Sequence, residues 1–263
     1  MSDLEKLESG FLDTLAVLKD VLPEILVVGG WCPYLYARYL WKKPIPKIPT
    51  TTDIDLGVLE TGSRHFDVTV YEKLKSAGYA LERIYAGEEL PVEFVYKRKT
   101  VELKVEFITS FETSDDTLNR FLGSELACNR IEVFELLLRQ AVSVPIKVKN
   151  ELLTVKIPPP EIFFYHKAIT FVMRSEEFKR DKDLFYAYFM LKFHPDKEAL
   201  LATLAGLEKD DYFRAFGENI REYLSDYSSP GYLMLRPFLR GWIEEGSING
   251  EIQNAFKEIF RLL

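Results

Sequence analysis

Two aspartates separated by one residue, Asp53 and Asp55, lie in the strand-like run Thr52-Asp53-Ile54-Asp55-Leu56. Side chains two residues apart on a β-strand point to the same face, so the two carboxylates are expected side by side. Carboxylates that close repel each other unless a cation lies between them. Mg²⁺, or Mn²⁺ in its place, suits such a site because both ions prefer oxygen ligands. The pair therefore predicts a metal site.

A glycine pair, Gly29-Gly30, follows the β-branched run Val27-Val28 some twenty residues earlier. The surrounding sequence has neither the third glycine of a dinucleotide-binding loop nor the Gly-Lys-Ser/Thr of a Walker loop. We expect a turn whose amide groups, with the start of the next helix, bind the phosphates of an NTP, helped by the hydroxyl of Thr52. An ordinary tight turn is the alternative.

A third metal ligand is expected from Glu106, which lies between apolar residues in a strand-like run. A buried strand does not tolerate a lone glutamate without a partner. By alternation Glu102 and Lys104 share its face, so Glu102 is a rival ligand and Lys104 an ion-pair partner. The alternative is that Glu106 only pairs with Lys104 or with a neighbouring strand.

The second half of the chain carries a cluster of charges in a helical pattern. Lys167 and Arg174 are seven residues apart, two helical turns, and are expected on one side of a helix over 161–174. Lys182 and Asp183 follow in the run 179–183. The functional interpretation is a positive cluster that binds triphosphate, with Asp183 orienting a lysine or acting as general base. The alternative is a solvated helix start. His166 invites an acid–base role but fits a hydrogen-bonded packing position equally well.

Composition excludes several classes of protein. A net charge of −7 argues against a nucleic-acid coat or a membrane-surface protein, and stable DNA binding is not expected. No apolar run is long enough to span a membrane, and the N-terminus is acidic rather than signal-like. Two isolated cysteines, Cys32 and Cys128, indicate neither a disulfide framework nor a zinc site. We expect a cytoplasmic protein.

Periodicity predicts a mixed sheet flanked by helices, followed by a helical region after Pro158-Pro159-Pro160. The expected fold is therefore α/β (α+β), with domains at 1–157 and 158–263. Helices are expected at 4–21, 31–41, 66–77 and over most of 117–142, although 131–138 is apolar enough for a strand. Strands are expected at 25–28, 53–59, 79–86, 91–98, 101–109, 144–149 and 152–157. The last region is expected to be helical, with breaks near Pro195, Gly217, Pro230 and Gly246.

The Gly29-Gly30 turn, a helix, and Thr52-Asp53-Ile54-Asp55 together resemble the signature of the DNA-polymerase-β-like nucleotidyltransferase superfamily. Glu106 fits the third carboxylate of that superfamily. The Gly-Gly-Trp triplet is similar to aminoglycoside and lincosamide nucleotidyltransferases. The later pattern of Lys167, Arg174 and Lys182-Asp183 is similar to abortive-infection (type IV) toxin nucleotidyltransferases, in which the lysine and aspartate are implicated in nucleotide binding and activity.

The resemblance implies a nucleotidyltransferase fold with a C-terminal helical domain that closes the cleft with Lys167 and Arg174. It implies two Mg²⁺ ions held by Asp53, Asp55 and Glu106, and transfer of NMP from an NTP to an acceptor hydroxyl. The acceptor is left open between tRNA or other RNA, a protein and a small molecule, and an antitoxin partner is possible. The competing hypothesis is an inactive nucleotidyltransferase-fold binding or regulatory module, which would be antitoxin-like. Intact aspartates at positions 53 and 55 weigh against it.

Overall fold

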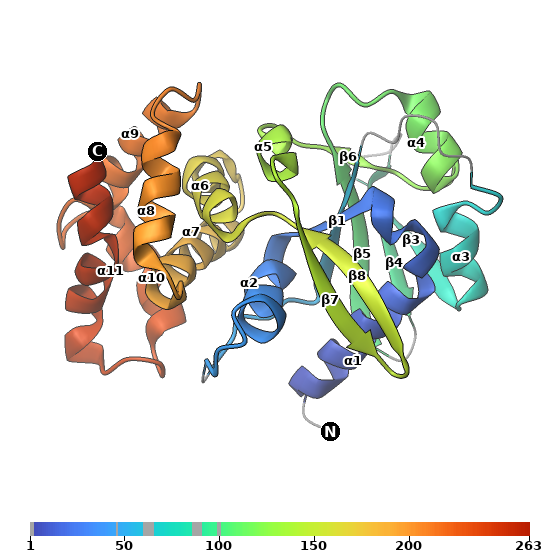
Figure 1. Ribbon diagram of the computed structural model, residues 1–263, viewed down its shortest axis with the longest axis horizontal. Coiled ribbons are helices and arrows are strands. Elements are labelled where there is room, and N and C mark those ends of the chain that lie inside the picture. Colours follow the sequence, from blue (N-terminus) through green and yellow to red (C-terminus); the bar gives the residue numbers. More distant parts are fainter. Residues whose placement is uncertain (1–2, 46, 60–65, 86–90, 99–100) are drawn as a thin grey trace. The chain divides into compact units, whose positions relative to one another are not determined.

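The computed structural model describes residues 3–45, 47–59, 66–85, 91–98 and 101–263 (Figure 1). Side chains are described for these residues apart from residue 3 and those between 83 and 102. The chain divides into two compact units. Unit 1 comprises Met1–Lys42 and Pro49–Pro158, and unit 2 comprises Lys43–Ile48 and Pro159–Leu263. The proline-rich segment Lys43–Ile48 therefore belongs to the helical unit, which its position in the sequence did not indicate.

Unit 1 is built on one mixed sheet, in which the described strands run in the order β3-β4-β5-β2-β1-β8-β7, with β6 also paired to β5. The strands are β1 (Ile25–Val28), β2 (Asp53–Val58), β3 (Tyr79–Tyr85), β4 (Pro91–Arg98), β5 (Val101–Thr109), β6 (Asn129–Arg130), β7 (Val142–Val148) and β8 (Glu151–Ile157). Its α-helices are α1 (Asp3–Val17), α2 (Cys32–Leu35), α3 (Val70–Ser76), α4 (Asp115–Leu122) and α5 (Phe134–Leu138), and they flank the sheet (Figure 1). The predicted α/β class is confirmed.

The two faces of the central strands are covered to different extents. Ile54 and Leu56 on β2 and Val105 on β5 point to one face and are fully buried. On the other face, Leu26 and Val28 of β1 pack with Phe134 and Leu137 of α5. The ring of Phe134 fills the space above Gly57, where a Cβ atom would come within 2.7 Å of it. On this second face α5 covers the end of β2 near Gly57. Asp53 and Asp55, nearer the start of β2 on the same face, are therefore only half-buried.

Several expected elements in unit 1 begin or end elsewhere. The first helix ends at Val17, and Pro23 lies in the 3₁₀ helix η1 (Lys19–Glu24) that follows it. The helix expected from residue 66 begins only at Val70, because Thr69 forms a capping box with Glu72. The alternative of a strand over 131–138 is wrong, since α5 occupies Phe134–Leu138. A hairpin forms at 149–150 as expected, with Lys149 at φ 55°.

Unit 2 consists of helices around an aromatic core. They are α6 (Pro160–Thr170), η4 (Phe171–Met173), α7 (Glu177–Phe193), α8 (Lys197–Gly206), α9 (Phe213–Leu224), α10 (Pro230–Leu239), η5 (Glu245–Ser247) and α11 (Ile248–Leu262). The expected break at Gly217 is wrong, because that residue is buried within α9. Phe185 of α7 stacks on Phe238 with ring centroids 5.1 Å apart, and the ammonium of Lys47 lies 5.4 Å from the ring centroid of Trp242. That cation–π contact joins Lys47 to a ring of unit 2.

Within the part of the chain that the structure describes, no helix combines the length and the apolar character that crossing a membrane requires.

Candidate active site

Asp53 and Asp55 lie on the same face of β2, at the centre of the sheet. The residues between and after them, Ile54 and Leu56, are fully buried on the opposite face, whereas both aspartates are half-buried. Asp55 is paired in register with Val28 of β1, the residue immediately before the glycine turn. The sheet thus places the second carboxylate directly beside the Gly29-Gly30 turn.

Glu106 reaches the same face through the parallel pairing of β2 with β5. Its register partner is Asp55, and the register partner of Asp53 is Lys104. Paired residues on neighbouring strands point to the same side of the sheet, so the three carboxylates share one face. The rival ligand, Glu102, lies outside the residues whose side chains are described. Lys104 shares this face with Glu106, two residues away on β5, and the register sets Lys104 opposite Asp53.

Gly29 makes room for the carboxylate of Asp55. It has φ 65°, in the left-handed region, and a Cβ atom built on it would lie 1.7 Å from Oδ2 of Asp55. No side chain fits there, so glycine is required for two reasons, backbone conformation and space. The sequence predicts contact of this turn with phosphate. Its contact with the carboxylate of Asp55 depends on the pairing of β1 with β2, which no local pattern indicates. The buried Gly30 continues the turn in the short 3₁₀ helix η2 (Gly29–Trp31).

Two threonines, Thr51 and Thr52, precede Asp53, and they form different hydrogen bonds. The backbone N–H of Asp53 donates to Oγ1 of Thr51 at 3.3 Å, and the Thr51 hydroxyl lies 3.5 Å from Oδ2 of Asp53. Thr52, the threonine expected to help bind phosphate, is exposed, and its carbonyl accepts a hydrogen bond from the backbone N–H of Lys104 at 2.9 Å. Thr51 therefore orients Asp53, while Thr52 ties β2 to β5.

The donor set fits a hard divalent cation. Three carboxylates on one face, with a glycine whose missing Cβ admits one of them, offer the oxygen ligands that Mg²⁺ and Mn²⁺ take. Among the described residues, no three His, Cys, Asp or Glu side chains converge closely enough to form a ready-made metal site. A cation between these carboxylates would offset the repulsion of their like charges.

A second cluster of predicted residues forms inside unit 2. Nζ of Lys167 donates to Oδ1 of Asp183 at 2.7 Å, and Nε of Arg174 donates to Oδ2 at 3.0 Å. The side chains of Lys167 and Asp183 are about 95% buried, whereas that of Arg174 is 44% exposed. The expected continuous helix over 161–174 is wrong, since α6 ends at Thr170 and Arg174 has an extended backbone. Asp183, rather than a shared helix face, brings the two cations together.

The carboxylate of Asp183 is ionised and fully engaged. Burial by itself would raise its pKa, but Lys167 and Arg174 beside it hold the pKa below the ordinary value of 3.8. Of the two roles expected for Asp183, the geometry favours orientation of the lysine, because both carboxylate oxygens already accept charged hydrogen bonds. Lys182, the neighbouring residue in the pattern, is turned elsewhere, with its ammonium 6.0 Å from the ring centroid of Phe178.

Replacement of Asp183 by asparagine is expected to destabilise unit 2 by about 3–5 kcal/mol, since it leaves the ammonium of Lys167 buried without a full counter-charge. Urea unfolding at pH 7 measures the loss. In the wild type the stabilisation is present above pH 3.8 and disappears as the pH falls through the lowered pKa of Asp183. The double variant Lys167→Met/Asp183→Leu is the control and should recover most of the stability. Equal stability of wild type and Asp183→Asn would contradict the assignment.

His166 is buried beside this ion-pair cluster and is electrically neutral. Its side chain is only 4% exposed, and neither ring nitrogen has a hydrogen-bond partner, which corrects the expected hydrogen-bonded position. Burial, reinforced by the positive charge of Lys167, lowers its pKa from 6.5 to about 3. A protonated imidazole is therefore not accommodated here, and an acid role near neutral pH is disfavoured.

The neutral state of His166 predicts a pH dependence of stability. Because its folded pKa is depressed, the unfolded chain binds the proton first, and stability is lost as the pH falls below 6.5. The slope approaches about 1.4 kcal/mol per pH unit below that value. Urea unfolding of the wild type and of His166→Leu between pH 5 and 7 measures it, and the leucine variant should lack this component. Parallel pH profiles for the two proteins would refute the prediction.

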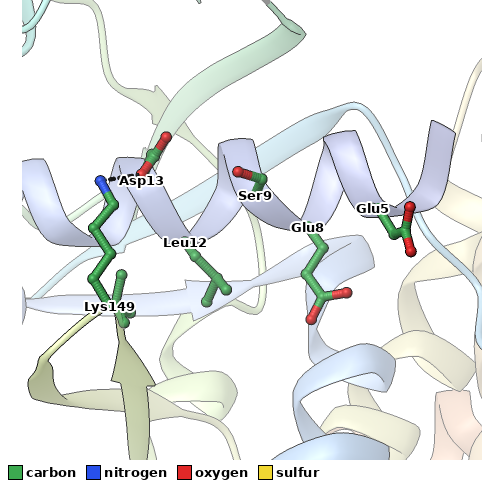
Figure 2. A pocket seen from close by; sticks show the side chains of 7 residues that line it. Glu5, Glu8, Ser9, Leu12, Asp13 and Lys149 are labelled. Carbon is green, nitrogen blue, oxygen red and sulfur yellow. Dashed lines mark ion pairs between the residues drawn. The ribbon is translucent and has the colours of Figure 1, made fainter. Parts of the chain in front are cut away.

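A hollow elsewhere on unit 1 holds none of the predicted site residues. It has a volume of about 530 Å³ and is lined by Glu5, Glu8, Ser9, Leu12, Asp13, Val148 and Lys149 (Figure 2). Lys149 pairs with Asp13 at 3.0 Å, and the hydroxyl of Tyr34 donates to Glu8. Charges that lie along this groove are thus partly neutralised by neighbours on the same unit.

Comparison with known proteins agrees with the chemistry of these residues. A family model described as Nucleotidyltransferase matches residues 11–206, well over half of the chain. None of the curated proteins compared with the chain matches it. The chain is similar to a solved structure, an antigenic nucleotidyltransferase-like protein from Paracoccidioides brasiliensis, with 15% identity, coverage of 80% of this chain and 89% of that chain, and a TM-score of 0.38. At that score the structural similarity adds nothing to the family match. The chain belongs to the nucleotidyltransferase family, whose model spans both the carboxylate face of the sheet and the Lys167–Asp183 pair.

Proposed function

We propose that this protein is a Mg²⁺-dependent nucleotidyltransferase that moves NMP from an NTP to an acceptor hydroxyl. The observation that carries the proposal is the position of Asp55. It lies in register with Glu106 on one side and against the Gly29 turn on the other, with Asp53 on the same face. Membership of the nucleotidyltransferase family supports the transfer chemistry in general.

In the proposed reaction, the acceptor oxygen forms a bond to the α-phosphorus of the NTP while the bond from that phosphorus to the bridging oxygen of the β-phosphate breaks. Pyrophosphate leaves with the electron pair, and the hydroxyl proton passes to solvent or to a nearby carboxylate. Divalent ions, when bound, would activate the acceptor oxygen and offset the charge of the leaving group. Asp53, Asp55 and Glu106 would hold these ions, and Gly29 keeps the place of the second carboxylate open.

Residues of unit 2 are proposed to assist in nucleotide binding. Cations offset phosphate charge, and Arg174 is the member of the cluster whose side chain remains accessible to solvent. Lys167 and Asp183 would then act as a buried support that fixes the guanidinium. A role of Lys182 in nucleotide binding is proposed from the resemblance in sequence pattern alone.

The acceptor is proposed to be an RNA such as tRNA, a protein or a small molecule. The proposal of an antitoxin partner rests on the resemblance to abortive-infection toxins, and the proposal of a cytoplasmic location rests on the composition of the sequence. Base preference depends on the shape of the site around the nucleobase rather than on a short motif.

The proposal is tested by incubating the purified protein with each α-³²P-labelled NTP, Mg²⁺, and either total cellular RNA or total protein. Transfer of label that EDTA abolishes is the expected result. Equilibrium binding of the same NTPs, with and without Mg²⁺, runs in parallel. Metal-dependent NTP binding without transfer to any acceptor tested would favour the alternative of a binding module. Absence of both binding and transfer would refute the proposed function.

A further inference from the structure

Lys104 of β5 lies on the same face of the sheet as the carboxylates of the proposed metal site. Lys104 is the register partner of Asp53, just as Glu106 is the register partner of Asp55. Directly paired residues of neighbouring strands lie side by side and point to the same face of the sheet. The ammonium group of Lys104 is thus confined to the face that carries the three carboxylates.

The burial pattern of β5 excludes the opposite orientation for this side chain. Leu103 and Val105, on either side of Lys104, are 2% and 0% exposed and fill the core. Lys104 itself is half-buried, and its backbone N–H is bonded to Thr52, so its position on the sheet is fixed.

The ammonium of Lys104 has no polar partner among the residues whose side chains are described. Among the described residues its side chain forms neither a hydrogen bond nor an ion pair, whereas Lys19, Lys73 and Lys149 each pair with a carboxylate. A cation placed next to Asp53 but not bonded to it is available to a ligand. Because the three neighbouring carboxylates repel anions, the ligand has to bring its own compensating cations. Metal-bound phosphate fits this requirement, and lysine is a common phosphate-binding residue.

We propose that Lys104 binds the triphosphate of the NTP, donating to phosphate oxygens on the nucleotide that the metal ions hold against Asp53 and Asp55. This inference rests on the proposed function. It assigns to β5 two different tasks, with Glu106 facing the metal and Lys104 facing the phosphates.

The test uses inorganic tripolyphosphate, which has no base and therefore does not depend on base preference. Calorimetry measures binding of Mn²⁺ alone, and then of tripolyphosphate in the presence of saturating Mn²⁺. The Lys104→Met variant should bind tripolyphosphate about 10- to 100-fold more weakly, the loss expected for a charged hydrogen bond. Its affinity for Mn²⁺ alone should stay equal to that of the wild type or rise. Lys104→Arg should keep most of the affinity for tripolyphosphate.

Lys147→Met is the matched control, because Lys147 is an exposed lysine on the strand β7 of the same sheet. It should bind both ligands as the wild type does. Unchanged tripolyphosphate binding by Lys104→Met would overturn the inference, and so would an equal loss of Mn²⁺ and tripolyphosphate binding, which would indicate a structural role. Absence of Mn²⁺ binding in the wild type itself would instead remove the proposed function, and this inference with it.

Discussion

The Asp55→Asn variant is expected to lose both Mg²⁺-dependent NTP binding and label transfer, with transfer at least about 1000-fold slower than in the wild type. Asp55 occupies the central place on the carboxylate face, between the Gly29 turn and Glu106. Asparagine keeps the size of the side chain but removes the charge and one acceptor oxygen. A loss of about 1000-fold corresponds to about 4 kcal/mol of transition-state stabilisation. Initial rates of transfer and calorimetric binding of NTP with Mg²⁺ measure the two effects.

Folding of the same variant separates chemistry from stability. Removal of one of several neighbouring negative charges relieves repulsion, so the thermal midpoint of Asp55→Asn should equal or exceed that of the wild type in the absence of metal. Asp116→Asn is the control, because Asp116 is an exposed aspartate in the first turn of α4. It should transfer label at the wild-type rate. Full transfer by Asp55→Asn would exclude the enzymatic proposal based on this site.

Gly29→Ala is expected to disrupt the site and to lower the stability of unit 1. The added methyl group would lie 1.7 Å from Oδ2 of Asp55, so either the carboxylate or the turn has to move. The positive φ of 65° adds the cost of a left-handed alanine, about 1–2 kcal/mol. The combined destabilisation should exceed about 2 kcal/mol, with loss of metal-dependent NTP binding. Urea unfolding and calorimetry measure these quantities.

Gly78→Ala isolates the conformational part of that effect. Gly78 also has positive φ, 84°, but nothing lies within 4 Å of a Cβ atom placed on it. This control should lose only about 1–2 kcal/mol and keep NTP binding. The double variant Gly29→Ala/Asp55→Ala removes the clashing carboxylate and should recover stability relative to Gly29→Ala, without recovering binding. If Gly29→Ala behaves like Gly78→Ala, contact with the carboxylate is not the reason for glycine at position 29.

Local patterns in the sequence predicted most of unit 1 because strand periodicity and turn residues act over short distances. The strand 25–28 is a β-branched run ended by glycines, and the placement of Asp53 and Asp55 on one face follows from the alternation of any strand. Element boundaries were less well predicted. The apolar pattern that begins at Phe66 predicts an earlier helix start. The helix begins at Val70 because Thr69 caps it, in a capping box with Glu72.

In unit 2, local patterns predicted the helices, but they did not predict which charged side chains contact one another. Lys167 and Arg174 have the spacing of one helix face, yet the backbone leaves the helix after Met173. Asp183, from the next helix, satisfies both cations in the interior. A spacing rule cannot anticipate this contact, because the energy that decides it comes from burying the charges together.

The sequence by itself determined which residues have the chemistry for metal and phosphate, and which of them share a strand face, because side-chain type and β-alternation are local properties. Only the tertiary structure decided which strands are neighbours. The parallel pairing of β2 with β5 sets Glu106 beside Asp55 and Lys104 beside Asp53, and the return of β1 brings Gly29 against the carboxylate of Asp55. These contacts join residues far apart in the chain, and burial of the sheet's apolar face, rather than any short motif, selects them.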